Sequence, residues 1–184
     1  MLLYHINVGY PVLSEGSRYL APIKHAVWAS HQQSYRAQNT GYNRFPNPRT
    51  GFLEQVWEHC LVPDSNGKVP VAVVNDSFDN GKGLGLLLEV NKTEFPCHIE
   101  WQNFQEGQYT VGIEPSTNHV LGKRFAKERN ELIWLEHGET REYTTTLSIL
   151  EGESIRAAED RIRAITEQPP DEYPPLSGEW EQLR

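Results

Sequence analysis

The strongest constraint on the fold is the repeated alternation between short runs of strand-forming residues and clusters of turn-forming residues. Val, Thr, Leu and aromatic side chains fill the runs, and Gly, Asn, Asp and Pro separate them. This pattern is typical of antiparallel sheets, whereas a βαβ unit requires a helix between successive strands. The chain is therefore predicted to be all-β, with an antiparallel β-sandwich and one C-terminal helix.

The expected strands are 2–8, 54–61, 69–74, 83–90, 97–104, 109–113, 132–135 and 142–150. The clearest hairpin joins 54–61 to 69–74 through Asn66 and Gly67, because this pair readily adopts the positive φ angles of a tight turn. In 142–150, alternate residues are apolar or bulky, and such alternation buries one face of a sheet.

The one convincing helix covers 153–166, where apolar residues recur at helical spacing among charged ones: Ile155, Ala158, Ile162 and Ile165. Residues 22–51 are rich in Gln, Asn, Arg and Pro and are expected to form a long irregular loop. We expect a single sandwich domain over 1–167, followed by a Pro-rich acidic tail over 168–184.

Composition excludes several classes of function. The net charge of −8 and a pI near 5.4 disfavour binding to nucleic acid or to anionic membranes, because both depend on clustered Lys and Arg. No apolar run approaches the ~20 residues that cross a bilayer, and the first residues do not resemble an export signal. A cytoplasmic protein is therefore expected.

The cysteines predict neither a disulfide framework nor a metal site. The chain has only Cys60 and Cys97, and they do not form a CxxC motif. Each is adjacent to a histidine, in His59-Cys60 and in Cys97-His98, but neighbours on a strand point to opposite faces of the sheet. No metal site is expected.

Glu114 is the strongest candidate for a catalytic base. It ends an apolar strand and precedes Pro115, Ser116 and Thr117, so a rigid strand opens there into a polar loop. Apolar neighbours would raise the pKa of this carboxyl toward neutrality, which suits a general base. The alternative is a structural glutamate that accepts hydrogen bonds from the loop backbone.

His5 is the candidate for the partner acid. It lies in Tyr4-His5-Ile6-Asn7, a strand-like run in which His5 and Asn7 share one face because side chains two residues apart point the same way. An imidazole can donate or accept a proton near pH 7. The alternative is a histidine held by hydrogen bonds in a structural role.

With these two segments, the chain resembles the galactose-mutarotase-like superfamily, which contains the aldose 1-epimerases and their uncharacterised bacterial relatives. The resemblance extends from about residue 2 to about residue 150. The resemblance rests on the run from His5 to Pro11, on Glu114-Pro115, and on the Glu100-Trp101-Gln102 stretch. It implies that the chain forms part of the family's larger supersandwich. It also implies that His5 faces the ring oxygen of a sugar while Glu114 faces the anomeric hydroxyl.

The implied activity is the interconversion of sugar anomers by an acid and a base, without a cofactor. The expected ligand is a small carbohydrate, and the side chains expected to orient it are Asn7, Trp101, Gln102 and Asn118. Complete family members are about twice as long, so the chain resembles their C-terminal half. A homodimer or a complementing chain is therefore expected, because half a sandwich leaves sheet edges open. The alternative is a non-catalytic carbohydrate-binding or assembly module, or an inactive truncated member.

Overall fold

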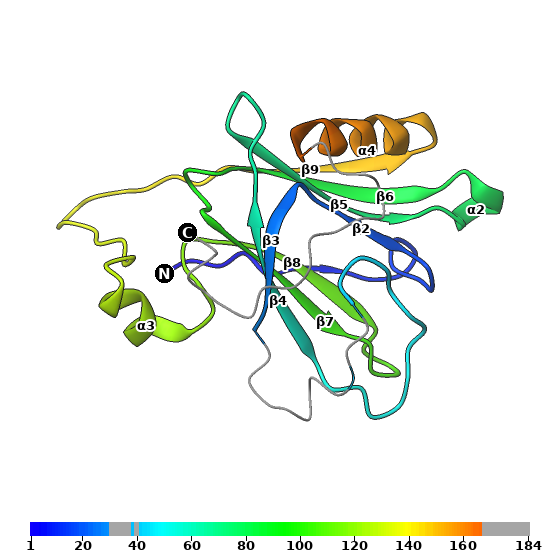
Figure 1. Ribbon diagram of the computed structural model, residues 1–184, viewed down its shortest axis with the longest axis horizontal. Coiled ribbons are helices and arrows are strands. Elements are labelled where there is room, and N and C mark those ends of the chain that lie inside the picture. The colour runs from blue at the N-terminus through cyan, green and yellow to red at the C-terminus, as the bar shows by residue number, and fades with distance from the viewer. Residues whose placement is uncertain (30–37, 39–40, 167–184) are drawn as a thin grey trace.

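Two antiparallel sheets pack face to face in the computed structural model, which describes residues 1–29, 38 and 41–166 (Figure 1). One sheet has five strands in the order β1 (Ile6–Val8), β8 (Thr110–Ser116), β7 (Cys97–Asn103), β4 (Gln55–Leu61) and β3 (Ile23–Trp28). The other has four, in the order β2 (Arg18–Leu20), β5 (Lys68–Asn75), β6 (Leu84–Asn91) and β9 (Thr145–Glu151). The predicted all-β sandwich is confirmed.

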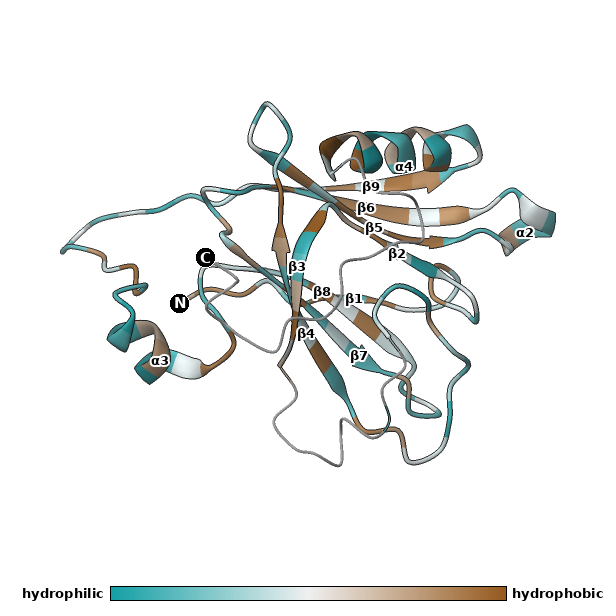
Figure 2. Cartoon of the chain, viewed as in Figure 1, coloured by the Kyte–Doolittle hydropathy of each residue, from teal (hydrophilic) through white to brown (hydrophobic). Residues whose placement is uncertain are grey.

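The main core lies between the two sheets. Val111 and Ile113 of β8 and Trp57 of β4 pack there against Val71 and Val73 of β5, and all five are buried. Because side chains alternate along a strand, the neighbours of these residues point away from the core. In Figure 2, β4 and β7 accordingly change between brown and teal along their length, whereas β5 and β6 are largely brown because the C-terminal helix covers their other face.

The C-terminal helix α4 (Glu153–Thr166) covers the face of the four-stranded sheet that points away from the main core (Figure 1). Its buried residues Ile155, Ala158 and Ile162 pack in a second cluster with Val74 of β5 and Leu150 of β9. The predicted helix is confirmed, and it packs on the four-stranded sheet. Ile165, the fourth predicted anchor, is only partly buried.

Gly83 and Gly85 let α4 and the neighbouring strands approach β6 closely. A Cβ at Gly83 would lie 2.6 Å from Ile155 Cδ1, and one at Gly85 would lie 3.1 Å from the carbonyl oxygen of Val73. Gly83 also has a φ of 79°, which non-glycine residues rarely adopt. At both positions a side chain would collide with, or press closely on, a neighbouring segment.

The predicted hairpin between 54–61 and 69–74 is wrong. Gly67 does adopt a positive φ of 76° in the connecting turn, but β4 and β5 belong to different sheets. β5 pairs instead with β6 and β2, while β4 pairs with β7 and β3. The turn therefore carries the chain from one layer of the sandwich to the other.

Two other expectations need correction. Residues 22–51 are not wholly irregular, because β3 lies within them and pairs with β4. Residues 132–135 do not form a strand: no strand of the described chain pairs with this run, and Trp134 and Leu135 are 67 % and 57 % exposed. The tail at 168–184 lies outside the described residues.

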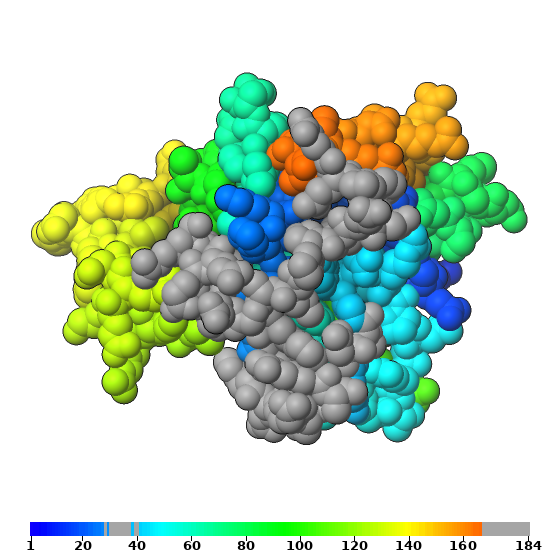
Figure 3. Space-filling view, viewed as in Figure 1, coloured from blue at the N-terminus to red at the C-terminus, as the bar shows by residue number. Residues whose placement is uncertain are grey.

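Two short helices complete the described elements. α2 (Phe78–Gly81) follows β5, and α3 (Gly122–Glu128) follows β8. Figure 3 shows α3 and the residues after it as a projection at one side of the molecule. Among the described residues, no helix combines the length and the apolar character that crossing a membrane requires.

Candidate functional site

The face of the five-stranded sheet that points away from the core, here called the outer face, carries the two predicted catalytic groups. β1 pairs with β8 so that Asn7 lies opposite Gly112, and β8 pairs with β7 so that Gly112 lies opposite Trp101. Residues two apart share a face, which places His5 with Asn7 and Glu114 with Gly112. The structure thus brings His5 and Glu114 together from segments more than a hundred residues apart in sequence.

His5 and Glu114 are in direct contact. The Nε2 atom of His5 lies 2.9 Å from Oε1 of Glu114, and among the described residues Oε1 accepts no hydrogen bond of good geometry. The Glu114 side chain is 5 % exposed and that of His5 is 44 % exposed, so the pair meets solvent through the imidazole. A buried carboxyl oxygen without a hydrogen bond is available to an incoming ligand.

Burial raises the pKa of Glu114 to about 7. The charged carboxylate loses the water that would stabilise it, and the pKa rises because the neutral form is favoured. Near neutral pH, Glu114 therefore exchanges a proton easily, as a general base must.

Trp101 and Asn7 lie beside this pair. The rings of Trp101 and His5 meet edge to face, with 5.4 Å between their centroids, and Trp101 Nε1 donates a 2.8 Å hydrogen bond to Glu54. Asn7 is exposed at its position opposite Gly112. An aromatic edge and an amide are thus placed next to the acid and base, where a polar ring could contact both.

Gly112 makes room for the carboxyl group. A Cβ at this position would collide with Oε1 of Glu114 and lie 3.1 Å from Cε1 of His5. The absence of a side chain at Gly112 therefore lets Glu114 lie flat across the strand toward His5. No sequence pattern predicted a role for this glycine.

The other two predicted ligand contacts lie elsewhere. Gln102 is fully buried on the core side of β7, where its Nε2 donates hydrogen bonds to Gly41 O at 2.9 Å and to Glu100 at 2.8 Å. Asn118 is buried after β8 and donates to Glu131 O at 2.7 Å. The structure brings neither side chain to the His5 and Glu114 pair.

Inside the sandwich, Glu100 and His59 form a second carboxyl and imidazole pair that the sequence analysis missed. Their atoms Oε2 and Nε2 are 3.0 Å apart, and neither side chain is exposed. Burial raises the pKa of Glu100 and lowers that of His59, so the pair is a hydrogen bond between neutral groups. It lies on the opposite side of the sheet from Glu114 and is structural.

We expect Glu100→Ala to lower the free energy of unfolding by about 2 kcal/mol, because it leaves the imidazole of His59 buried without its partner. For a domain of this size, this change corresponds to a Tm lower by about 4–8 °C. Thermal unfolding followed by circular dichroism measures the shift. Glu151→Ala, at an exposed position on β9, is the control and should leave Tm nearly unchanged; equal shifts would contradict a role for the buried pair.

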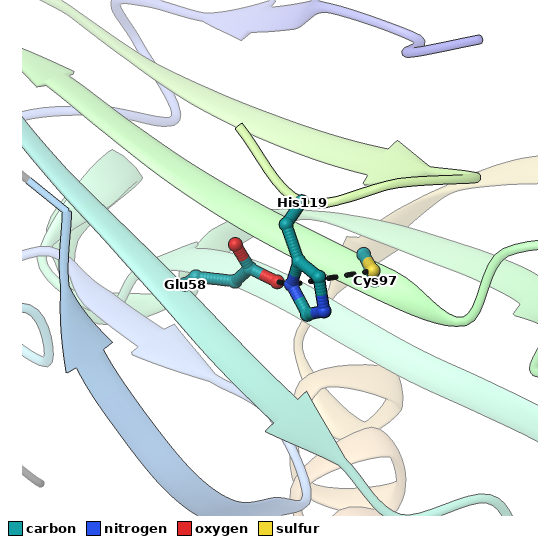
Figure 4. A group of neighbouring side chains, drawn as sticks. All are labelled: Glu58, Cys97 and His119. Atoms are coloured by element: carbon teal, nitrogen blue, oxygen red, sulfur yellow. Dashed lines mark hydrogen bonds and ion pairs between the residues drawn. The ribbon is translucent and has the colours of Figure 1, made fainter. Parts of the chain in front are cut away.

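A third cluster could hold a metal ion. Glu58 of β4, Cys97 of β7 and His119 converge so that their ligand atoms all lie within 4.8 Å of one another (Figure 4). Cys97 and His119 also line a cavity of about 570 Å³ that includes neither His5 nor Glu114. As predicted, neighbouring residues on a strand point to opposite faces, so Cys97 and the adjacent histidine do not share a site. Cys97 instead lies near Glu58 of β4 and His119, which come from other segments.

Comparison with protein families and with curated sequences gives one match and one negative result. The family model described as "Domain of unknown function (DUF4432)" matches residues 1–149. Curated proteins give no match to the sequence. The sequence match covers every strand of the five-stranded sheet.

Comparison with solved structures identifies a relative of the same fold. A crystal structure of a "putative aldose 1-epimerase" from Klebsiella pneumoniae subsp. pneumoniae superposes with a TM-score of 0.78 and 25% sequence identity. The match covers 89% of this chain and 42% of that one, so the chain spans less than half the length of this relative. The galactose-mutarotase-like fold implied by the sequence is confirmed.

Proposed function

The chain belongs to the DUF4432 family, and from the contact between Glu114 and His5 we propose that it is an aldose 1-epimerase-like protein. Its substrate is a free sugar or a simple sugar derivative, whose anomers it interconverts by general acid and base catalysis. The observation that carries the proposal is the 2.9 Å contact between an exposed imidazole and a buried carboxyl group whose pKa is about 7. The similarity to a "putative aldose 1-epimerase" supports it.

The proposed reaction needs one proton removed and one proton supplied. Glu114 takes the proton from the hydroxyl on C1, and protonated His5 gives a proton to the ring oxygen. The C1 to ring-oxygen bond breaks, the aldehyde rotates about the C1–C2 bond, and the ring closes on the other face. A positioned acid and base each contribute roughly 10²–10⁴-fold to such a step.

A sugar would enter by replacing the contact between the two groups. Oε1 of Glu114 accepts no hydrogen bond of good geometry among the described residues, so it can take one from the anomeric hydroxyl. Trp101 offers an aromatic surface beside His5, and exposed Asn7 offers an amide on the same face. Gln102 and Asn118 have no direct part in this binding mode because their amides hold the backbone of other segments.

We expect kcat/KM to rise as the pH increases from 5 through about 7, because this rise follows the loss of the proton from Glu114. The pKa of Glu114 is raised to about 7 by burial, and only its deprotonated form can act as the base. Optical rotation of a freshly dissolved α-anomer, recorded from pH 5 to pH 9 and corrected for the uncatalysed rate, measures the profile. A rate that stays constant from pH 5 to pH 8 would contradict the role of Glu114.

The proposal includes a partner chain and a cytoplasmic location. Leu147 and Ile149 of β9 lie opposite Leu88 and Leu86 in the register of the four-stranded sheet, yet they are 51 % and 63 % exposed. Apolar side chains on this strand at the sheet edge support pairing with a second copy or with a complementing chain. The relative is also more than twice as long as the matched region.

A non-catalytic carbohydrate-binding module is distinguished from the proposed enzyme by one comparison. Both would bind sugar, measured by titration calorimetry with several aldoses. Only the enzyme would accelerate the approach to anomeric equilibrium. Saturable binding without acceleration would identify the binding module.

A further inference from the structure

Three side chains suited to binding zinc meet on the outer face, away from the His5 and Glu114 pair. Glu58 and Cys97 come from neighbouring strands, and His119 follows β8. Glu58 lies opposite Ile99, so Cys97 is its diagonal neighbour on the same face, within reach of the longer glutamate side chain. Ile99 also lies opposite Glu114, which places the cluster one strand away from the proposed base.

The separation between the sulfur and nitrogen ligand atoms fits a shared metal ion. The Sγ atom of Cys97 lies 3.7 Å from Nδ1 of His119. Zinc bonds of about 2.3 Å to sulfur and about 2.0 Å to nitrogen, at a tetrahedral angle, separate these two atoms by roughly 3.5 Å. The observed separation is thus close to the edge of a zinc tetrahedron.

The arrangement does not suit a catalytic triad. Both Cys97 and an oxygen of Glu58 approach the same ring nitrogen of His119, Nδ1 (Figure 4). A triad needs the nucleophile and the carboxylate on opposite ring nitrogens, because one nitrogen receives the proton while the other is held in place. A metal ion instead needs one ligand atom from each side chain close to a common point, and the three ligand atoms here lie within 4.8 Å of one another.

Charge and burial point the same way. The cluster is nearly closed to solvent: Glu58 is 1 % exposed, His119 7 % and Cys97 8 %. The Oε2 atom of Glu58 is buried and accepts no hydrogen bond of good geometry among the described residues. A thiolate, a carboxylate and a neutral imidazole carry two negative charges together, which Zn²⁺ would neutralise in a site where unpaired charge is costly.

A further carboxylate is placed to orient the imidazole. Oε2 of Glu131 lies 3.7 Å from Nε2 of His119, and the other oxygen of Glu131 accepts a 2.6 Å hydrogen bond from Arg129. A carboxylate near the outer ring nitrogen would help to hold the imidazole with Nδ1 turned toward Glu58 and Cys97, as outer carboxylates hold metal-binding histidines. Glu131 is therefore a positioning residue.

We infer that Glu58, Cys97 and His119 bind one Zn²⁺ ion, with the fourth coordination position open toward the adjacent cavity. Three protein ligands and one open position are the usual arrangement of zinc sites that also bind water or a small molecule. Since Cys97 and His119 line the cavity of about 570 Å³, an oxygen ligand could reach the ion from it. The inference is independent of the proposed sugar chemistry.

Cobalt substitution tests the site directly. Protein stripped of metal with a chelator and kept reduced is titrated with Co²⁺, whose bond to a thiolate gives a near-ultraviolet charge-transfer band. We expect the band to saturate at one Co²⁺ per chain and to disappear when Zn²⁺ is added. Cys97→Ser should abolish the band, and Glu131→Gln should weaken Co²⁺ binding by about 10–100-fold.

Cys60→Ser is the matched control. Continuing the register of β4 and β7 places Cys60 opposite Cys97, and Cys60 lines the same cavity, but it lies outside the cluster. This variant should keep the band. X-ray absorption of the zinc-loaded natural sequence should show one sulfur at about 2.3 Å with nitrogen and oxygen ligands at about 2.0 Å.

The outcomes that overturn the inference are distinct. A missing cobalt band, a zinc shell without sulfur, or equal loss of the band in Cys60→Ser would each refute the three-ligand site. Glu114→Gln should bind Co²⁺ as the natural sequence does. Failure of the metal site is therefore distinguishable from failure of the proposed anomer interconversion.

Discussion

Glu114→Gln should reduce the catalysed rate of anomer interconversion by at least about 10²-fold, because an amide cannot accept the proton of the anomeric hydroxyl. Its shape is nearly that of the carboxyl group, so the strand and the contact with His5 should be retained. Polarimetry of a freshly dissolved aldose measures the loss. Glu151→Gln, an exposed change on the other sheet, should keep the full rate.

The same substitution should not destabilise the protein above neutral pH. The pKa of Glu114 rises from 4.5 in the unfolded chain to about 7 in the folded one, so the folded state holds this proton more tightly. Its contribution to stability is present at low pH and is lost as the pH rises from 4.5 through 7. At pH 8, Glu114→Gln should therefore unfold at a Tm equal to or above that of the natural sequence. A clearly lower Tm would mean that the lost activity reflects misfolding.

Gly112→Ala should lower kcat/KM by about 10²-fold while leaving the fold intact, because displacement of a catalytic group by about 1 Å has an effect of this size. The added methyl group would collide with Oε1 of Glu114, which lies at the end of a flexible side chain and can turn aside. The φ of Gly112 is not in the positive range, so the backbone accepts alanine. The measurement is kcat/KM by polarimetry together with Tm.

Gly9→Ala is the control for this change. A Cβ at Gly9 would meet only the carbonyl oxygen of Tyr109, at 3.9 Å, and should disturb nothing. If Gly112→Ala kept full activity, the carboxyl position seen in the structure would not be the catalytic one. Loss of activity in both variants would indicate a general effect of the added methyl groups rather than displacement of Glu114.

Most strands could be predicted because their side chains alternate or form apolar runs between turn residues. β3 was missed because Lys24 and His25 interrupt its apolar pattern within a polar segment. The run at 132–135 was predicted as a strand because it is apolar, but pairing needs a neighbour that sequence alone does not supply. The sheet assignment of β4 and β5 depends on long-range pairing and could not be inferred from the tight turn between them.

The candidate site could be predicted only in part. His5 and Glu114 were found from their sequence contexts and from the family resemblance, and the structure brings them together. Gln102 could have been set aside from sequence, because it is adjacent to Trp101 on one strand and only one of the two can face a given ligand. The cluster of Glu58, Cys97 and His119 has no local spacing motif, since its members come from distant segments.

The most direct test of the account is exchange NMR on an aldose already at anomeric equilibrium, with and without the protein. We expect cross-peaks between the α and β signals of at least one aldose with the natural sequence, and their disappearance with Glu114→Gln. Absence of exchange for every aldose tested, in samples where calorimetry shows that sugar binds, would contradict the assignment of Glu114 and His5 as base and acid.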